Sequence, residues 1–144
     1  MKRTILIEVI IFLLILLFAY TAISKIMTFS SFKYVLSKSP ALQLLAPVLA
    51  WAIPAIEIIV VVLLVIPRTR NLGLWGSFFL LLLFTVYITY MLLFTPDRPC
   101  NCGGVLKEMT WNQHLLFNIF FTTVSLWGIY LMRKEKTTSV LQLN

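Results

Sequence analysis

Residues 5–24 read ILIEVIIFLLILLFAYTAIS, the strongest structural signal in the chain. Glu8 is the only charged residue in this stretch, and a helix of about 20 apolar residues is what a bilayer crossing requires. The stretch is longer than the apolar region of a secretory signal peptide, and no small-residue cleavage pattern closes it. We therefore interpret residues 5–24 as a first membrane span that is not cleaved.

Three further apolar blocks follow, at about residues 42–66, 72–94 and 111–132. The chain has 144 residues, of which 60% are hydrophobic, so almost no sequence is left for a separate soluble domain. Each block is long enough to cross a bilayer as a helix. We predict an all-α, polytopic membrane protein, with residues 1–144 forming one domain built as a bundle of four transmembrane helices.

The basic residues lie at the ends of these blocks and predict the topology. Seven of the 12 Lys and Arg residues occupy three short segments, around Lys2, Arg68 and Arg133, and the other five occupy two longer connections, about 25–46 and 95–110. Because Lys and Arg are retained on the cytoplasmic side, both termini are expected in the cytoplasm and both longer connections outside it. No basic groove with interleaved aromatic residues is present, so the net charge of +7 does not indicate a nucleic-acid partner.

The first outer connection carries a second helical pattern. Phe29, Phe32 and Leu36 recur at helical spacing, and polar residues occupy the opposite face. This pattern predicts a short amphipathic helix over residues 29–39 that lies in the headgroup region. Pro40 suits the first position of a helix, so we expect the second long helix to begin there.

The second outer connection contains the only two cysteines, Cys100 and Cys102, followed by Gly103 and Gly104. As a structural disulfide the pair would close a very short loop and contribute only about 1–2 kcal/mol through loop entropy. A strained, exposed disulfide is instead easily reduced, as labile and catalytic disulfides are. The glycines allow the backbone dihedrals of a tight ring and leave space for a partner's sulfur. The pattern favours redox chemistry, with metal binding and an inert pair as the alternatives.

The fourth block begins with a capping-box pattern, Thr110-Trp111-Asn112-Gln113. A polar stripe then runs from Trp111 through His114 and Asn118 along one helix face, which should turn toward protein rather than lipid. His114 is a candidate to stabilise a thiolate of the dithiol. With the two cysteines it would supply three ligands for a soft metal ion, without an evident fourth for a structural zinc site.

Two polar residues inside other blocks are candidates to line the same interior. Glu57 lies deep in the second block, where a charge costs several kcal/mol, so it should face the bundle interior and have a partner. Its role can be structural or functional. Tyr87 lies toward the outer end of the third block, as an interfacial anchor or as a neighbour of a buried polar group.

The chain resembles the MauE/DoxX family of redox-associated bacterial membrane proteins. The likeness runs through Ser24-Lys25 and through Pro54 with Glu57 to the cysteine loop, and it covers nearly the whole chain. Its most specific part is the Cys-x-Cys-Gly-Gly loop followed by the Trp-x-x-His motif at Trp111.

The resemblance implies a four-helix bundle in the bacterial inner membrane that handles thiols or electrons, with the cysteine loop on the periplasmic side. Cys100, Cys102 and His114 would carry thiol–disulfide exchange or electron transfer. The remaining candidates would support them around a cavity; these are Glu57, Tyr87, Gly103, Gly104, Trp111 and Asn118. The partner would be a thioredoxin-like periplasmic protein or a maturing redox enzyme, with an association to methylamine utilisation.

Relatives linked to thiosulfate:quinone oxidoreduction make a quinone the one cofactor to consider, and no resident metal is expected. Two alternative functions stay open. The first is a non-enzymatic membrane assembly factor whose cysteine loop docks a client. The second is a protein that binds or transports soft heavy metals.

Overall fold

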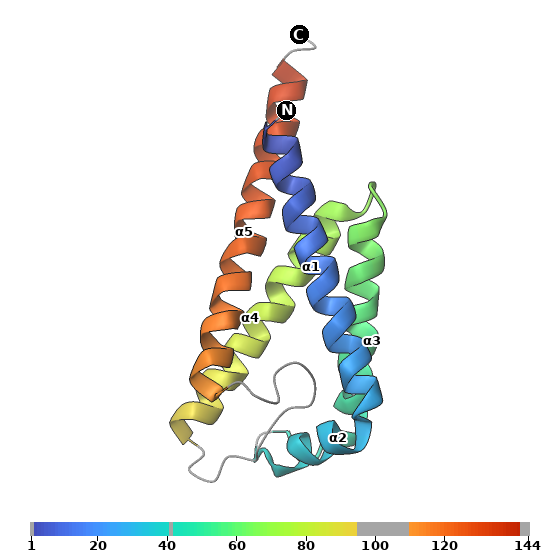
Figure 1. Ribbon diagram of the computed structural model, residues 1–144, viewed down its shortest axis with the longest axis vertical. Coiled ribbons are helices and arrows are strands. Elements are labelled where there is room, and N and C mark those ends of the chain that lie inside the picture. The colour runs from blue at the N-terminus through green and yellow to red at the C-terminus, as the bar shows by residue number, and fades with distance from the viewer. Residues whose placement is uncertain (1, 41, 95–109, 142–144) are drawn as a thin grey trace.

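The computed structural model describes residues 2–40, 42–94 and 110–141. The elements in these ranges are five helices, and no strand occurs among them. Figure 1 shows their arrangement. In chain order they are α1 (Lys2–Met27), α2 (Phe29–Lys38), α3 (Ala46–Val65), α4 (Arg70–Phe94) and α5 (Trp111–Leu141). The predicted all-α fold class is confirmed.

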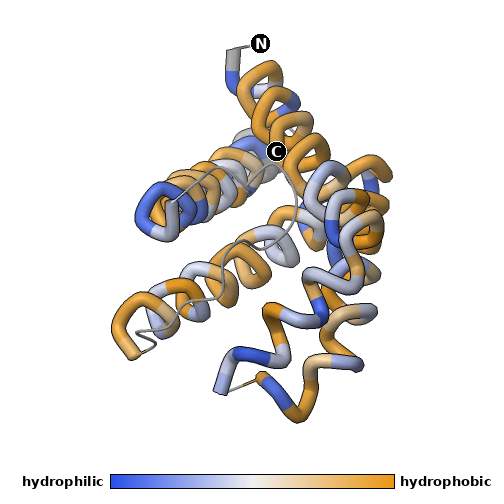
Figure 2. Tube along the Cα trace, turned by 60° about the horizontal axis from the view of Figure 1, so that its bottom comes forward, coloured by the Kyte–Doolittle hydropathy of each residue, from blue (hydrophilic) through white to orange (hydrophobic). Residues whose placement is uncertain are grey.

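Four of the helices are long and apolar enough to cross a membrane. The spans are Arg3–Met27, Ala46–Val65, Arg70–Phe94 and Trp111–Glu135. Large hydrophobic side chains are exposed along their outer faces, and Figure 2 shows hydrophobic residues dominating the long helices while α2 alternates with hydrophilic ones. Lipid tails solvate such faces as well as a protein interior does. The molecule is therefore a multi-pass membrane protein surrounded by lipid.

The long helices associate as two pairs, α1 with α3 and α4 with α5. The pairs meet where α1 begins, because α4 follows α3 after a tight turn and α5 also packs on α1. They diverge toward the opposite end, which holds α2, the end of α4 and the start of α5 (Figure 1). We call this the α2 end of the bundle.

Close packing where the pairs meet depends on small residues. A Cβ atom on Gly73 would lie 2.9 Å from the backbone nitrogen of Leu64, and one on Gly128 would lie 3.0 Å from Cγ2 of Ile10. The buried Ser125 hydroxyl also donates to the Leu74 carbonyl at 3.1 Å, which joins α5 to α4. Small residues of this kind let membrane helices approach closely. This end of the bundle is consequently the more tightly joined one.

The amphipathic helix α2 is confirmed, and its buried residues are Phe32, Val35 and Leu36. Phe32 and Leu36 pack against Ala46 and Ala50 at the start of α3. This contact holds α2 against the first turns of α3.

The predicted start of the second long helix at Pro40 is wrong, because α3 begins at Ala46. Ser39 ends α2 with an extended backbone, and its carbonyl accepts hydrogen bonds from the amides of Leu42 and Gln43. The chain thus turns before it re-enters a helix. The proline in the first turn of α3 is Pro47. The preference of proline for the start of a helix therefore holds for Pro47 and not for Pro40.

Candidate functional site

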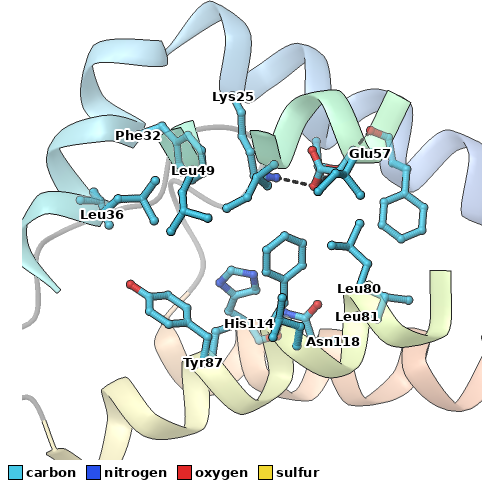
Figure 3. Close-up of a pocket in the computed structure, with 18 of the residues that line it drawn as sticks. Lys25, Phe32, Leu36, Leu49, Glu57, Leu80, Leu81, Tyr87, His114 and Asn118 are labelled. Carbon is cyan, nitrogen blue, oxygen red and sulfur yellow. Dashed lines mark hydrogen bonds and ion pairs between the residues drawn. The ribbon is translucent and has the colours of Figure 1, made fainter. Parts of the chain in front are cut away.

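A cavity of about 440 Å³ lies between the two helix pairs at the α2 end. All five helices contribute to its walls, which are mostly apolar. Its polar or aromatic-polar lining residues are Tyr20, Thr21, Ser24, Lys25, Glu57, Tyr87, Tyr90, Trp111, His114 and Asn118. Figure 3 shows Lys25 and Glu57 on one side of the cavity and Tyr87, His114 and Asn118 on the other. Ligand cavities of about 300–1,000 Å³ with a few placed polar groups are typical of small-molecule sites.

The α1–α3 wall carries a buried ion pair. Lys25 lies in the last turn of α1, and its Nζ is 2.7 Å from Oε1 of Glu57 in α3. The Glu57 side chain is 1% exposed and that of Lys25 is 14% exposed. Thr21, one turn before Lys25, donates its hydroxyl to the same carboxylate oxygen at 3.2 Å. A charged group inside a span costs free energy unless it is paired in this way.

Two aromatic rings flank the ammonium group of Lys25. Its Nζ lies 5.8 Å from the ring centre of Phe32 in α2 and 5.5 Å from that of Phe84 in α4. Both distances fall within the range of cation–π attraction. Lys25 therefore stands at the point where α1, α2, α3 and α4 come together around the cavity.

The opposite wall is the polar stripe of α5 together with Tyr87 of α4. Asn118 is buried and donates from Nδ2 to the His114 carbonyl at 3.3 Å. Trp111 and His114 belong to the first turns of α5 and line the cavity. The stripe faces protein, as its pattern predicted.

The start of α5 is fixed by the predicted capping box. The Thr110 amide donates to Oε1 of Gln113 at 2.9 Å, and the Gln113 amide donates to the Thr110 hydroxyl at 3.3 Å. The two bonds satisfy amide groups that a helix start otherwise leaves without partners. This reciprocal cap sets the position from which Trp111 and His114 reach the cavity.

The structure thus brings five of the predicted site residues to one cavity, namely Glu57, Tyr87, Trp111, His114 and Asn118. Cys100, Cys102, Gly103 and Gly104 lie outside the described residues, so their part in the site stays a prediction. Among residues 2–40, 42–94 and 110–141, no three His, Cys, Asp or Glu side chains gather closely enough to hold a metal ion.

Lys25 is the site residue that sequence reasoning missed. The sequence pattern places it in the outer connection, but it belongs to α1 and points into the bundle. A signal was present, because Thr21 and Lys25 are four residues apart and so share one helix face. A buried Glu57 requires a cation, and Lys25 is the basic residue on that face.

The comparisons with known proteins agree with this architecture. The model of a family described as "Methylamine utilisation protein MauE" matches residues 3–131. This range contains the first three membrane spans and the fourth as far as Leu131. Neither the curated proteins nor the solved structures give a match.

Proposed function

The chain belongs to the MauE family, and on that premise we propose that it performs thiol–disulfide exchange through Cys100 and Cys102. The exchange would serve the maturation of a periplasmic redox protein, and the family's description supports an association with amine utilisation. The protein would reside in the bacterial inner membrane, with both termini in the cytoplasm and the cysteine loop on the periplasmic side.

The observation that carries this proposal is the position of His114. It lies in the first turns of α5, directly after the segment that contains the dithiol, and it lines a cavity whose opposite wall holds the ammonium of Lys25. A protonated imidazole close to a cysteine favours the thiolate form, which is the reactive form of cysteine. The α2 end of the bundle is therefore suited to support a reactive dithiol.

The exchange balances without a further reactant. A thiolate of one protein attacks the disulfide of the other, a mixed disulfide forms, and the second cysteine of the dithiol resolves it. One S–S bond passes between the two proteins, and two electrons and two protons pass the opposite way. The partner is a protein dithiol or disulfide of the thioredoxin-like or client class.

Trapping of the mixed disulfide tests the proposal. Single variants Cys100→Ser and Cys102→Ser are expressed in cells, alkylated in acid and separated without reductant. At least one should accumulate a partner adduct that reductant dissolves, and the double variant should give none. Absence of an adduct from both single variants, with the wild-type thiols always reduced, would contradict exchange.

A client-maturation assay separates exchange from a non-enzymatic assembly role. If the protein only docks a client, the Cys100→Ser/Cys102→Ser variant should support maturation as well as the wild type. If exchange is required, that variant should lose most of the matured client, and His114→Phe should slow adduct formation without preventing it. Stoichiometric Cu(I) or Hg(II) binding that either serine substitution abolishes would instead favour metal handling.

A further inference from the structure

The cavity contains more hydrogen-bonding capacity than the protein itself uses. An ammonium group has three N–H donors, and Nζ of Lys25 directs one of them to Oε1 of Glu57. Oε2 of Glu57 is buried and has no hydrogen-bond partner among the described residues. Oε2 is an acceptor, so a ligand satisfies it only through an O–H or N–H donor, whereas the two remaining N–H donors of Lys25 are matched by an acceptor oxygen such as a carbonyl.

The cavity also reaches the surface that faces lipid. Tyr20, Leu83 and Val86 line it, and the same residues are 47%, 63% and 60% exposed on the outer faces of α1 and α4. These two helices make little contact with each other, because α1 pairs with α3 and α4 pairs with α5. A molecule dissolved in the bilayer can therefore approach the cavity sideways, between α1 and α4.

The electrostatics select the charge of such a molecule. Lys25 and Glu57 already neutralise each other at 2.7 Å. A ligand with its own net charge would add an uncompensated charge inside the span, which costs several kcal/mol. A neutral ligand with an oxygen acceptor can take a hydrogen bond from Lys25 without disturbing the balance of the pair.

We propose that this cavity binds a neutral lipophile that enters from the bilayer and presents a carbonyl oxygen to Nζ of Lys25. The apolar part of the ligand lies against Leu17, Ile53, Leu80 and Phe84. His114 and Asn118 face the carbonyl-bearing part of the ligand from the side opposite Lys25. The shared chemistry is a carbonyl group on an apolar body, as in an alkylated quinone or in the esters of a diacylglycerol. The described residues that carry this inference are Lys25, Glu57 and the apolar walls, so it goes beyond the exchange function and does not depend on it.

The test uses the purified full-length protein in lipid nanodiscs, with decylubiquinone, dioleoylglycerol and oleate as separate probes. Binding is measured by native mass spectrometry, and for the quinone also by quenching of tryptophan fluorescence, since Trp111 lines the cavity. At least one neutral probe should bind in a 1:1 ratio, and the Cys100→Ser/Cys102→Ser variant should bind it equally well. Which neutral probe binds identifies the source of the carbonyl group.

Three variants make the result specific to the cavity. The neutral double variant Lys25→Met/Glu57→Gln should bind the probe at least tenfold more weakly, and Lys33→Met, on the exposed face of α2, should bind as the wild type does. Ala52→Phe keeps the ion pair and fills part of the cavity, so it should also weaken binding. The proposal is overturned if neither neutral probe binds, if oleate binds more tightly than both, or if either the double variant or Ala52→Phe binds like Lys33→Met.

Discussion

Lys25 and Glu57 join the last turn of α1 to the middle of α3 through an ion pair of 2.7 Å, inside the membrane-spanning part of the bundle. The pair ties together the two helices of one half of the molecule and directs its polar atoms toward the other half (Figure 3). The polar stripe of α5 lies on the opposite wall of the cavity. The Lys25–Glu57 pair is thus buried at the end where the helix pairs diverge.

Breaking this pair should destabilise the protein more than removing it. Lys25→Met or Glu57→Gln alone leaves a buried partner uncompensated, and each should lower the free energy of unfolding by about 3–5 kcal/mol. The double variant should lose clearly less than the sum of the two single losses. Reversible unfolding in mixed micelles, followed by tryptophan fluorescence, measures all three values.

Lys33→Met is the matched control, because Lys33 is exposed on α2 and no ion pair of it occurs in the part of the chain that the structure describes. It should change the free energy of unfolding by no more than about 0.5 kcal/mol. Additive losses in the double variant would show that Lys25 and Glu57 do not stabilise each other.

Much of the fold was predictable from the sequence, because a bilayer requires long apolar helices and these are visible as apolar runs. The apolar runs and the capping box of Thr110 and Gln113 are local signals, and each appears in the structure as expected. The polar stripe through His114 and Asn118 was also readable, since polar groups in a span turn away from lipid. These features depend on one segment at a time.

The features that failed depend on two segments at once. Because the apolar run ends before Lys25, the local pattern predicts that this residue belongs to a loop. In the structure α1 continues to Met27, and Lys25 pairs with Glu57 of α3. Likewise, Pro40 satisfied a local rule for a helix start. Burial of Ser39 beside Met91, with the hydroxyl 3.7 Å from the sulfur, holds the chain in a turn there instead.

Gly73 should tolerate no side chain. A Cβ atom there would lie 2.9 Å from both the backbone nitrogen and Cγ of Leu64, so Gly73→Ala must push α4 away from α3. We expect a loss of about 1–3 kcal/mol in the free energy of unfolding, the usual cost of overpacking. Gly76→Ala is the control, because its Cβ would meet only Cγ2 of Val60, at 3.2 Å. Equal losses in the two variants would argue against the backbone clash.

The capping box should control the order of the first turn of α5. Thr110→Ala removes the hydroxyl that accepts from the Gln113 amide and should cost about 1 kcal/mol of helix stability. Hydrogen–deuterium exchange of the amides around Gln113 should accelerate about fivefold, the factor that this free energy corresponds to. Asn112→Ala, an exposed change in the same turn, should leave exchange unchanged. A similar acceleration in both variants would mean that Thr110 does not act as the cap.

The proposed orientation in the membrane rests on the positions of the basic residues. Arg68 and Arg70 lie at the turn between α3 and α4, the same end of the bundle as the start of α1, and Lys and Arg are retained in the cytoplasm. In a Cys100→Ser/Cys102→Ser background, Ser37→Cys on the exposed face of α2 should react with an impermeant maleimide in intact spheroplasts. Arg68→Cys, also exposed, should react only after the membrane is permeabilised, because the proposed orientation places it in the cytoplasm. The reverse labelling pattern would place α2 and the cavity at the cytoplasmic side, where a periplasmic thiol partner could not reach the adjoining loop.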